Sequence, residues 1–574
     1  MPPSALTEAP TTHTDPPSWK SETAFPRLTS EEIRELACLA ICEEKTDGQI
    51  VFSAGQPDMD LFVVEEGALE VINPAANNAS IVTHHAGEFS GDVDLLTRRP
   101  ILVTGIARGP RTRLLRVPGA RLREVLNRVP RLGEKLIIAF QARRALLEDC
   151  GMELGLRVVG PATCRDTTIV REFLHKNFVP FSWHDSVSPR GKELIASWGS
   201  PKRSPVIELG GGKLLIEPSL RELARGAGVW RECPDRQVDL VVIGAGPAGL
   251  AAAVYAASEG LDTIVLDRLG PGGQAGGSSK IENFIGFPAG LSGTELATRG
   301  VLQMLKFGAK LAAPVDVEEL IPSAEPGGLN SLRLDCGATI RAKTILVATG
   351  VRWRKLEAEG AARFERAGIY YACTSVEALL HDKQDVAVVG AGNSAGQAVM
   401  FLSECCRDRR VHHLIRGKLG PGMSQYMVSR IRSAPNVIVH EGVEVCRVTG
   451  ERRVQSVTLR QSEKAATSGD GQPRPTALEE LAVGAVFVFI GADPGAEWLP
   501  KSVARDSLGY LLTGVDAVKS GHWPLTSREP CPLETTLPGV MAAGDVRSGS
   551  TKRVGFAVGD GSLAVTCAHR LRSL

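Results

Sequence analysis

Several features that would narrow the function of this 574-residue chain are missing from its sequence. Its net charge is only +1, so no overall field attracts nucleic acid or acidic membranes. No apolar run approaches the ~18 residues of a membrane-spanning helix. The Pro-, Thr- and Ser-rich start lacks the apolar core of a signal peptide. We therefore expect a cytoplasmic protein without nucleic-acid or membrane partners, whose residues 1–27 form a disordered tail.

The sequence also lacks any C-x-x-C dithiol, although it contains 12 cysteines. Their spacing fits neither a disulfide framework nor a metal site, so we expect a reducing compartment, mostly buried thiols and no metal. Aromatic residues make up only 5%, whereas glycine (61) and proline (35) are abundant. This composition favours several α/β domains joined by tight turns.

A complete dinucleotide-binding pattern occupies residues 238–268, VDLVVIGAGPAGLAAAVYAASEGLDTIVLDR. An apolar strand leads to Gly244, Gly246 and Gly249, and an Ala-rich helix opens at Pro247 and Ala248. The glycines allow a tight turn and close approach of a pyrophosphate to the helix N-terminus. Asp267 follows the second strand about 20 residues later, the spacing of a ribose-hydroxyl acceptor. The alternative is a tight structural turn.

A second strand–turn–helix unit covers QDVAVVGAGNSAGQAVMFLSECC. Here the turn residues are Gly390, Gly392, Asn393, Ser394 and Ala395, and alanine is an accepted variant at the third glycine position. The next strand is followed by basic residues, Arg416 and Lys418, where an acid would mark NAD. Basic groups accommodate a 2′-phosphate, so the pattern favours NADPH. The alternative is that both cations belong to a solvated turn.

Three further segments extend this pattern: GGQAGGSSKIENFIGFP (272–288), TILVATG (344–350) and LPGVMAAGDV (537–546). With them, residues 238–574 resemble the low-molecular-weight thioredoxin reductase family. The resemblance implies FAD and NADPH as cofactors and a homodimer. The residues it places at the flavin, besides the glycine-rich turn, are Gly273, Gln274, Asn283, Val315, Gly350, Gly544, Asp545, Arg553 and Val554. The family's Arg-Gln-Ala reads Arg553-Val554-Gly555 here, so one side-chain contact is lost.

The family's redox-active C-A-T-C motif is altered in this chain. Its alignment with YACTSV places Ala372 and Ser375 where the two cysteines belong, and Cys373 falls between them. A serine cannot replace a thiolate in disulfide exchange. Cys373 could form a flavin adduct or a mixed disulfide, or it could be a small buried thiol. The usual flavin–dithiol relay is therefore expected to be absent.

Residues 153–232 read as βαβ followed by ββα, the order of a thioredoxin or glutaredoxin domain. Cys164 lies at the start of the first helix, beside Arg165, where the helix macrodipole would favour a thiolate. By resemblance, Pro205 is the typically cis proline, and Pro218-Ser219 begins a helix. The alternatives are a monothiol redox role for Cys164 and a degenerate docking or structural domain.

Residues 28–152 resemble the cyclic-nucleotide-binding family: a small β-barrel closed by a long helix over 122–149. The phosphate-binding segment reads Ser90-Gly91-Asp92, then Pro100-Ile101-Leu102. Asp92 could hold a ribose hydroxyl, but Ile101 replaces the arginine that grips the phosphate. Arg98 and Arg99 lie nearby in the sequence. The alternatives are nucleotide binding and a ligand-free regulatory or docking role.

Together these patterns predict an α/β protein with two Rossmann-like domains, preceded by a cyclic-nucleotide-binding-type β-barrel and a thioredoxin-like domain. The predicted FAD domain covers 236–352 and 490–574, and the NADPH domain covers 353–489. Links near 351–384 and 485–491 would be the hinge of a rotating NADPH domain.

The expected activity is NADPH-dependent reduction of FAD, followed by electron transfer to a disulfide or thioredoxin-like protein. The acceptor could instead be ferredoxin, quinone or oxygen. A redox-sensing or binding module without turnover is the third possibility.

Overall fold

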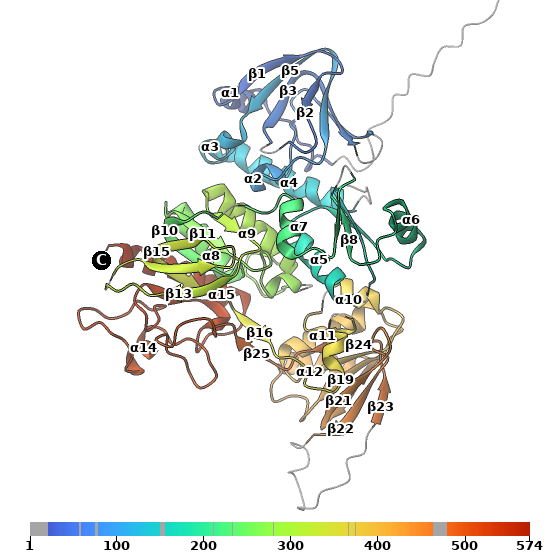
Figure 1. Cartoon of the computed structure of the whole chain (residues 1–574), viewed down its shortest axis with the longest axis vertical. Coiled ribbons are helices and arrows are strands. Elements are labelled where there is room, and N and C mark those ends of the chain that lie inside the picture. Colours follow the sequence, from blue (N-terminus) through green and yellow to red (C-terminus); the bar gives the residue numbers. More distant parts are fainter. Residues whose placement is uncertain are drawn as a thin grey trace, which may run out of the picture. The chain divides into compact units, whose positions relative to one another are not determined.

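A computed structural model gives the fold of the chain, which divides into two compact units, Met1–Leu154 and Gly155–Leu574 (Figure 1). The structure describes residues 21–56, 59–74, 78–149, 155–162, 164–209, 212–231, 233–278, 280–325, 327–365, 367–373, 375–462 and 479–573.

The first unit is built on a five-stranded antiparallel sheet. The strand order is β1–β5–β3–β4, and β2 also pairs with β5. The long central strands contribute buried leucine and valine side chains to the core. The strands are β1 (Ile41–Lys45), β2 (Ile50–Phe52), β3 (Leu61–Asn73), β4 (Ala79–His85) and β5 (Thr104–Val117).

Two sequence-based expectations about this unit need correction. The single helix predicted over 122–149 is two helices, because Pro130 lacks the amide hydrogen that would continue the first one. Residues 21–27, assigned to the tail, include a buried Phe25 that packs against His84 and Arg143. The first 20 residues lie outside the described part. The helices are α1 (Ser30–Ala37), α2 (Asp94–Thr97), η2 (Gly119–Arg121), α3 (Leu122–Arg128) and α4 (Pro130–Asp149).

The second unit begins with a four-stranded sheet in the order β7–β6–β8–β9. β6 and β7 are parallel, and the hairpin β8–β9 runs antiparallel to β6. This is the predicted βαβ–ββα order, and the Ser204–Pro205 peptide is cis as expected. The elements are β6 (Leu156–Val159), α5 (Arg165–Lys176), β7 (Phe181–His184), α6 (Pro189–Ser197), β8 (Val206–Glu208), β9 (Leu214–Ile216) and α7 (Leu220–Gly226).

A seven-stranded sheet follows, in the order β12–β11–β10–β15–β14–β13, with β26 beside β15. Its central strand β10 is apolar throughout its second half because both of its faces are buried. Leu240 and Val242 pack in one apolar cluster with helical residues, and Val241 and Ile243 pack in another with residues of neighbouring strands and loops. The strands are β10 (Arg236–Ile243), β11 (Thr263–Leu266), β12 (Lys310–Ala312), β13 (Val317–Ile321), β14 (Asn330–Leu334), β15 (Thr339–Val347) and β26 (Val540–Ala542). The helices are α8 (Pro247–Ser258), η3 (Ala275–Gly277), α9 (Gly293–Phe307), α14 (Val515–Lys519), η5 (Gly544–Val546) and α15 (Val554–Arg572). We call these strands and helices, which lie within residues 236–352 and 490–574, the flavin half.

The nicotinamide half, residues 353–489, contains a parallel sheet in the order β17–β24–β18–β19–β20 and a meander β21–β22–β23. The parallel strands are β17 (Ile369–Tyr370), β18 (Val386–Val389), β19 (Val411–Ile415), β20 (Val437–Glu441) and β24 (Ala485–Val488). The meander comprises β21 (Val443–Thr449), β22 (Ser456–Gln461) and β23 (Glu479–Ala482). The helices are η4 (Ala361–Phe364), α10 (Ser375–Leu380), α11 (Asn393–Cys405) and α12 (Gln425–Ser433).

The two chain crossings between these halves pair with each other as the antiparallel strands β16 (Val351–Trp353) and β25 (Ala492–Pro494). The link predicted over 485–491 is shorter in the structure, because its first four residues, Ala485–Val488, form the fully buried strand β24. The segment between β22 and β23, residues 463–478, lies outside the described residues.

The thiols are less buried than the sequence suggested. Of the eleven cysteines that the structure describes, only Cys233, Cys531 and Cys567 are buried, and none forms a disulfide. Within the described residues, no helix combines the length and the hydropathy that crossing a membrane requires. No metal-binding cluster of His, Cys, Asp or Glu occurs in this part of the chain either.

Candidate nucleotide-binding and redox site

The first glycine-rich turn connects β10 to α8 and leaves an open cradle at the helix N-terminus. A Cβ on Gly249 would lie 1.9 Å from the carbonyl oxygen of Gly244, so α8 packs directly on the turn. Gly246 is the N-cap of α8, and Gly273 approaches it so closely that a Cβ on Gly273 would lie 2.9 Å from the Gly246 Cα. Two chain segments thus bring bare backbone to the positive end of α8, as a pyrophosphate requires.

Gly544 joins the same cradle from the C-terminal part of the chain. A Cβ on Gly544 would lie 3.1 Å from the Cβ of Ala248, in the first turn of α8. The Gly544 amide donates to Asp560 Oδ2 (3.0 Å), and Arg547 Nε donates to the same oxygen (3.1 Å). Sequence reasoning missed Asp560, because no motif marks it. Asp560 lies in the second turn of α15 and accepts both of these hydrogen bonds.

Asp267 is more heavily bonded than a free ribose acceptor. Its Oδ2 accepts the amide of Ala245 (2.8 Å), and its Oδ1 accepts the amides of Leu269 and Gly270 (2.9 and 2.8 Å). A carboxylate offers about four acceptor positions, so Asp267 both braces the glycine turn and retains acceptor capacity. The amide of Val315 donates to the Asp267 carbonyl (2.9 Å), which places Val315 beside this residue.

The remaining predicted flavin residues differ in how directly they are connected to the cradle. Gln274 donates to the carbonyl of Val351, which ties the segment after Gly273 to β16. Gly350 has φ 63° with open space where a Cβ would stand, and Asn283 is exposed. Burial raises the pKa of Asp545, although Lys552 opposes this. Arg553 and Val554 form the N-cap and first residue of α15. The cradle therefore fits a dinucleotide flavin.

The second glycine-rich turn opens α11 in the same manner. Gly390 has φ 144°, and a Cβ there would lie 2.4 Å from the Phe489 carbonyl oxygen. Gly392 is the N-cap of α11 with open space around it. Asn393 Oδ1 accepts the Ser424 amide (2.9 Å), and Ala395 is buried against the sheet. Ser394 is exposed in the first turn.

Arg416 and Lys418 follow β19, at the carboxyl edge of the sheet beside this turn. Both side chains are exposed, and neither has a hydrogen-bond or ion-pair partner among the described residues. Two unpaired cations next to the N-terminus of α11 are suited to a 2′-phosphate. His413 Nε2, which the sequence analysis did not single out, lies 2.8 Å from the carbonyl oxygen of Gly390 and supports the turn.

Cys373 packs against the core of the nicotinamide half. Burial, reinforced by the nearby Glu377, raises the pKa of its thiol, and Arg409 offsets this only partly. A thiol held in its protonated form is a poor nucleophile. Among the described residues immediately on either side of Cys373, no second cysteine occurs. Cys405, at the end of α11, also raises the pKa of the Cys373 thiol.

Cys164 is the N-cap residue of α5, and its side chain makes no capping hydrogen bond. The opposite end of α5 contacts the flavin half. Lys176 Nζ donates to the carbonyl of Gly273 (3.2 Å), and Asn177 Nδ2 donates to the carbonyl of Leu269 (2.9 Å). The structure therefore brings the C-terminal end of α5, rather than Cys164, to the cradle.

In the first unit, the predicted ribose acceptor already has an internal partner. Asp92 Oδ2 accepts a bond from Arg144 Nη2 of α4 (2.6 Å), and the same nitrogen lies 2.9 Å from Asp94 Oδ1. Arg99 pairs with Asp94, so it is not available to a phosphate, and Arg98 has φ 53° at the end of α2. Burial raises the pKa of Asp92. Burial would also raise the pKa of Asp94, but Arg144 and Arg99 lower it. Sequence reasoning could not find Arg144, which lies some 50 positions away.

Two parts of the chain match known protein families. Residues 238–561 match the family described as pyridine nucleotide-disulphide oxidoreductase, and residues 43–129 match the cyclic nucleotide-binding domain. Among solved structures, the thioredoxin reductase of T. acidophilum has a TM-score of 0.50 and 25% identity, and the similarity covers 59% of this chain and 100% of that one.

Sequence relatives point the same way. The F subunit of alkyl hydroperoxide reductase in Pseudomonas putida is 33% identical over 339 residues, 58% of each chain. Thioredoxin reductase of Treponema pallidum is 30% identical over 331 residues, 58% of this chain and 95% of that one.

NADH dehydrogenase of Bacillus subtilis (strain 168) is 29% identical over 62% of each chain. The match thus spans about three fifths of the length of the larger relatives. The two glycine-rich turns and the family match over more than half of the sequence agree, and the chain belongs to the pyridine nucleotide-disulphide oxidoreductase family, with an N-terminal cyclic nucleotide-binding domain.

Proposed function

We propose that the protein is an FAD-dependent NADPH oxidoreductase of the thioredoxin reductase type that works without the usual C-x-x-C dithiol. The observation that carries this proposal is the pair of helix N-termini, at α8 and α11, each opened by a glycine turn with positive φ. A bound FAD would supply hydride acceptance and onward electron transfer.

The chain's own residues would bind and orient the two nucleotides. The α8 N-terminus with Gly244, Gly273 and Gly544 would hold the FAD pyrophosphate, and Asp267 would accept a ribose hydroxyl. Arg416 and Lys418 would hold the 2′-phosphate of NADPH at the carboxyl edge of the second sheet. Gln274, bonded to β16, would stabilise the segment that lines the flavin.

The domain division belongs to this proposal: residues 153–232 are a thioredoxin-like domain, 236–352 with 490–574 bind FAD, and 353–489 bind NADPH. The paired strands β16 and β25 are the natural pivot for rotation of the nicotinamide half, because the two chain crossings hydrogen-bond to each other there. A homodimer through the flavin half is also part of the proposal.

Two acceptor classes remain open to the enzyme. A disulfide acceptor, such as a thioredoxin-like protein, is suggested by relatives named as thioredoxin reductase and as the F subunit of alkyl hydroperoxide reductase. A non-thiol acceptor such as ferredoxin, quinone or oxygen is favoured by the raised pKa of the half-buried Cys373 thiol and by the absence of any C-x-x-C from the sequence. Redox sensing without turnover is the third possibility.

Anaerobic stopped-flow spectroscopy of the purified full-length protein tests the proposal. We expect a flavin spectrum that NADPH bleaches faster than NADH, and reoxidation by at least one acceptor from a panel of thioredoxin, a disulfide reagent, ferredoxin, a quinone and oxygen. Loss of the flavin spectrum, or faster reduction by NADH, would contradict the cofactor assignment. Rapid bleaching without reoxidation by any acceptor would favour a sensor.

A further inference from the structure

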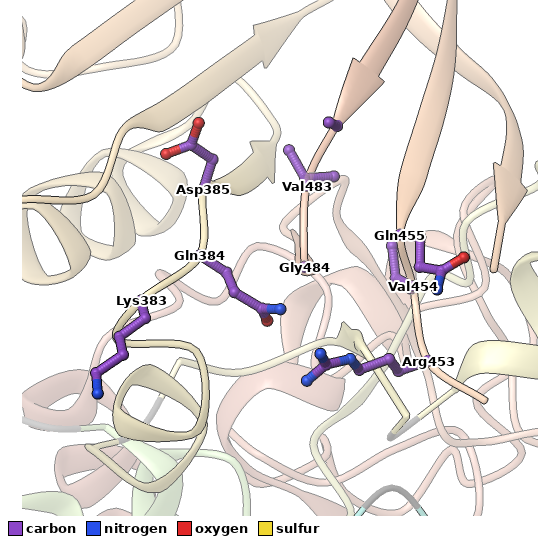
Figure 2. Close-up of a pocket in the computed structure, with 9 residues that line it drawn as sticks. Lys383, Gln384, Asp385, Arg453, Val454, Gln455, Val483 and Gly484 are labelled. Carbon is purple, nitrogen blue, oxygen red and sulfur yellow. The ribbon is translucent and has the colours of Figure 1, made fainter. Parts of the chain in front are cut away.

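A second hollow in the nicotinamide half lies at the end of the sheet opposite to the Gly390–Ala395 turn. It has a volume of about 380 Å³, within the size range of small-molecule sites. It opens where β18 and β24 begin, whereas the nucleotide turn follows the other end of β18, roughly 13 Å away for four strand residues. Its lining residues are Lys383, Gln384, Asp385, Arg453, Val454, Gln455, Ala482, Val483 and Gly484 (Figure 2).

The charge of this hollow is positive. Lys383 and Arg453 line it, and neither side chain has a hydrogen-bond or ion-pair partner among the residues that the structure describes. The carboxylate of Asp385 does not cancel them. Its Oδ1 accepts the Arg410 amide (2.9 Å), and its Oδ2 accepts Arg410 Nε and Nη2 (2.8 and 2.7 Å). Figure 2 shows Asp385 turned away from Gln384 and Arg453.

Gln384 is held in the hollow by a buried hydrogen-bond chain. Its Oε1 lies 3.0 Å from His381 Nδ1, and His381 Nε2 lies 3.1 Å from the hydroxyl of Tyr370. Because the amide oxygen is engaged, the amide NH₂ remains as a donor without a protein partner in the described chain. Gly484 makes room for it, since a Cβ there would lie 2.2 Å from Gln384 Oε1.

We propose that this hollow is a binding site for a small oxyanion, a phosphate monoester or a carboxylate. Gln384 and Arg453 point toward one another across the opening (Figure 2), so a guanidinium and a neutral amide donor converge on one ligand. A planar guanidinium can bind either oxyanion through two parallel hydrogen bonds. Lys383 lies at the rim, where Figure 2 shows its side chain directed away from Gln384 and Arg453, so it contributes positive charge only from a distance. The site is separate from the proposed nucleotide sites and does not depend on them.

Isothermal titration calorimetry on the full-length protein tests this site, with methyl phosphate and malonate as separate probes. Saturating 2′,5′-ADP is present to occupy any site beside Arg416. We expect at least one probe to bind saturably, and the probe that binds better identifies the ligand class. Arg453→Gln should weaken that binding by about tenfold or more, since a hydrogen bond to a charged group is lost. Lys383→Gln should weaken it in the same direction.

Arg452→Gln is the matched control, because Arg452 is the exposed neighbour of Arg453 and does not line the hollow. It should change affinity less than about twofold. Absence of saturable binding of either probe, or equal affinities for the Arg453 and Arg452 variants, would overturn the proposal. Failure of 2′,5′-ADP to bind would count only against the NADPH assignment, because the Arg453 comparison can still be made.

Discussion

Two exposed cations, Arg416 and Lys418, carry the proposed preference for NADPH, while a half-buried thiol, Cys373, stands where relatives of this family keep a dithiol. The cations are unpaired in the described chain and can meet a ligand without breaking an internal bond. Cys373 is held protonated by burial and Glu377. The proposed choice of nucleotide and the proposed path of electrons therefore depend on different residues.

Arg416→Gln with Lys418→Gln should reduce discrimination between the two nicotinamide nucleotides. Loss of charge-assisted bonds to a 2′-phosphate should raise the KM for NADPH by roughly tenfold or more and leave the KM for NADH nearly unchanged. Steady-state kinetics with both nucleotides measures this. Arg432→Gln, an exposed arginine of α12, is the control. An equal rise in both KM values would show that the cations act on folding or on the shared part of the cofactor.

Cys373→Ala should leave flavin reduction by NADPH unchanged and alter turnover by less than about twofold, because a thiol whose pKa is raised is a poor nucleophile. Single-turnover reduction and steady-state turnover with the best acceptor measure the two steps separately. Cys164→Ala, measured in parallel, tests the other candidate thiol. A tenfold loss of turnover with intact flavin reduction in either variant would place that cysteine in the electron path.

At the scale of elements, two helices and one group of strands matter most. α15 lies against α8 so closely that Gly561 has no room for a side chain: its Cβ would lie 2.2 Å from the Ala248 carbonyl oxygen. Ala248 belongs to the first turn of α8, so this contact positions the flavin cradle. In the nicotinamide half, burial lowers the pKa of four histidines that lie in or beside the parallel sheet: His381, His412, His413 and His440.

Gly561→Ala should destabilise the protein by about 1–3 kcal/mol, because a methyl group is forced into a filled helix–helix contact. It should also weaken flavin retention, since α8 would shift. Gly559→Ala on the same helix is a matched control with nothing within 4 Å of the added atom. We expect that variant to be neutral or up to about 1 kcal/mol more stable through helix propensity. Thermal unfolding and flavin content distinguish the two, and equal behaviour would contradict the packing argument.

Stability of the nicotinamide half should fall as the pH drops below the ordinary histidine value of 6.5. Burial lowers the pKa of each of the four histidines, so the unfolded state binds protons more readily than the folded state. The contribution is fully present above pH 6.5 and is lost as pH falls toward the folded pKa values. Each histidine can contribute up to about 1.4 kcal/mol per pH unit.

Thermal unfolding of the full chain at about pH 8 and about pH 5.5 measures this loss. His412→Gln with His440→Gln should reduce the pH dependence, because His412 Nδ1 lies 3.0 Å from His440 Nε2 in the folded protein, and both rings take up protons on unfolding in acid. His522→Gln, an exposed histidine, should leave it unchanged. An identical pH dependence in all three proteins would refute the linkage.

At the scale of the whole molecule, the chain joins a cyclic nucleotide-binding domain to a pyridine nucleotide-disulphide oxidoreductase. In the first unit, the carboxylate expected at the ribose is bonded to Arg144, and Ile101 stands where a phosphate-gripping arginine would be. A ligand would have to displace a buried ion pair without gaining a cation in return. The unit is therefore suited to a role that needs no nucleotide.

The full-length protein should not bind cyclic AMP or cyclic GMP at concentrations up to about 100 µM, because no cation is available to bind the phosphate of either nucleotide. Equilibrium dialysis with each nucleotide measures this. Ile101→Arg is the informative variant, since it restores the missing cation beside the same segment. Saturable binding to the unaltered protein would contradict the internal-pair argument.

The two strand–turn–helix units can be read from the sequence alone, because apolar strands, glycines at tight turns and a following helix are local patterns. The sequence also marked the missing dithiol at Cys373, and the resemblance to the thioredoxin reductase family is confirmed by the family match. The folded chain was needed to show that Asp92 meets Arg144, that Gly561 meets Ala248, and that residues near 384, 453 and 484 enclose one hollow. These contacts join positions far apart in the chain, and side-chain packing across elements sets them.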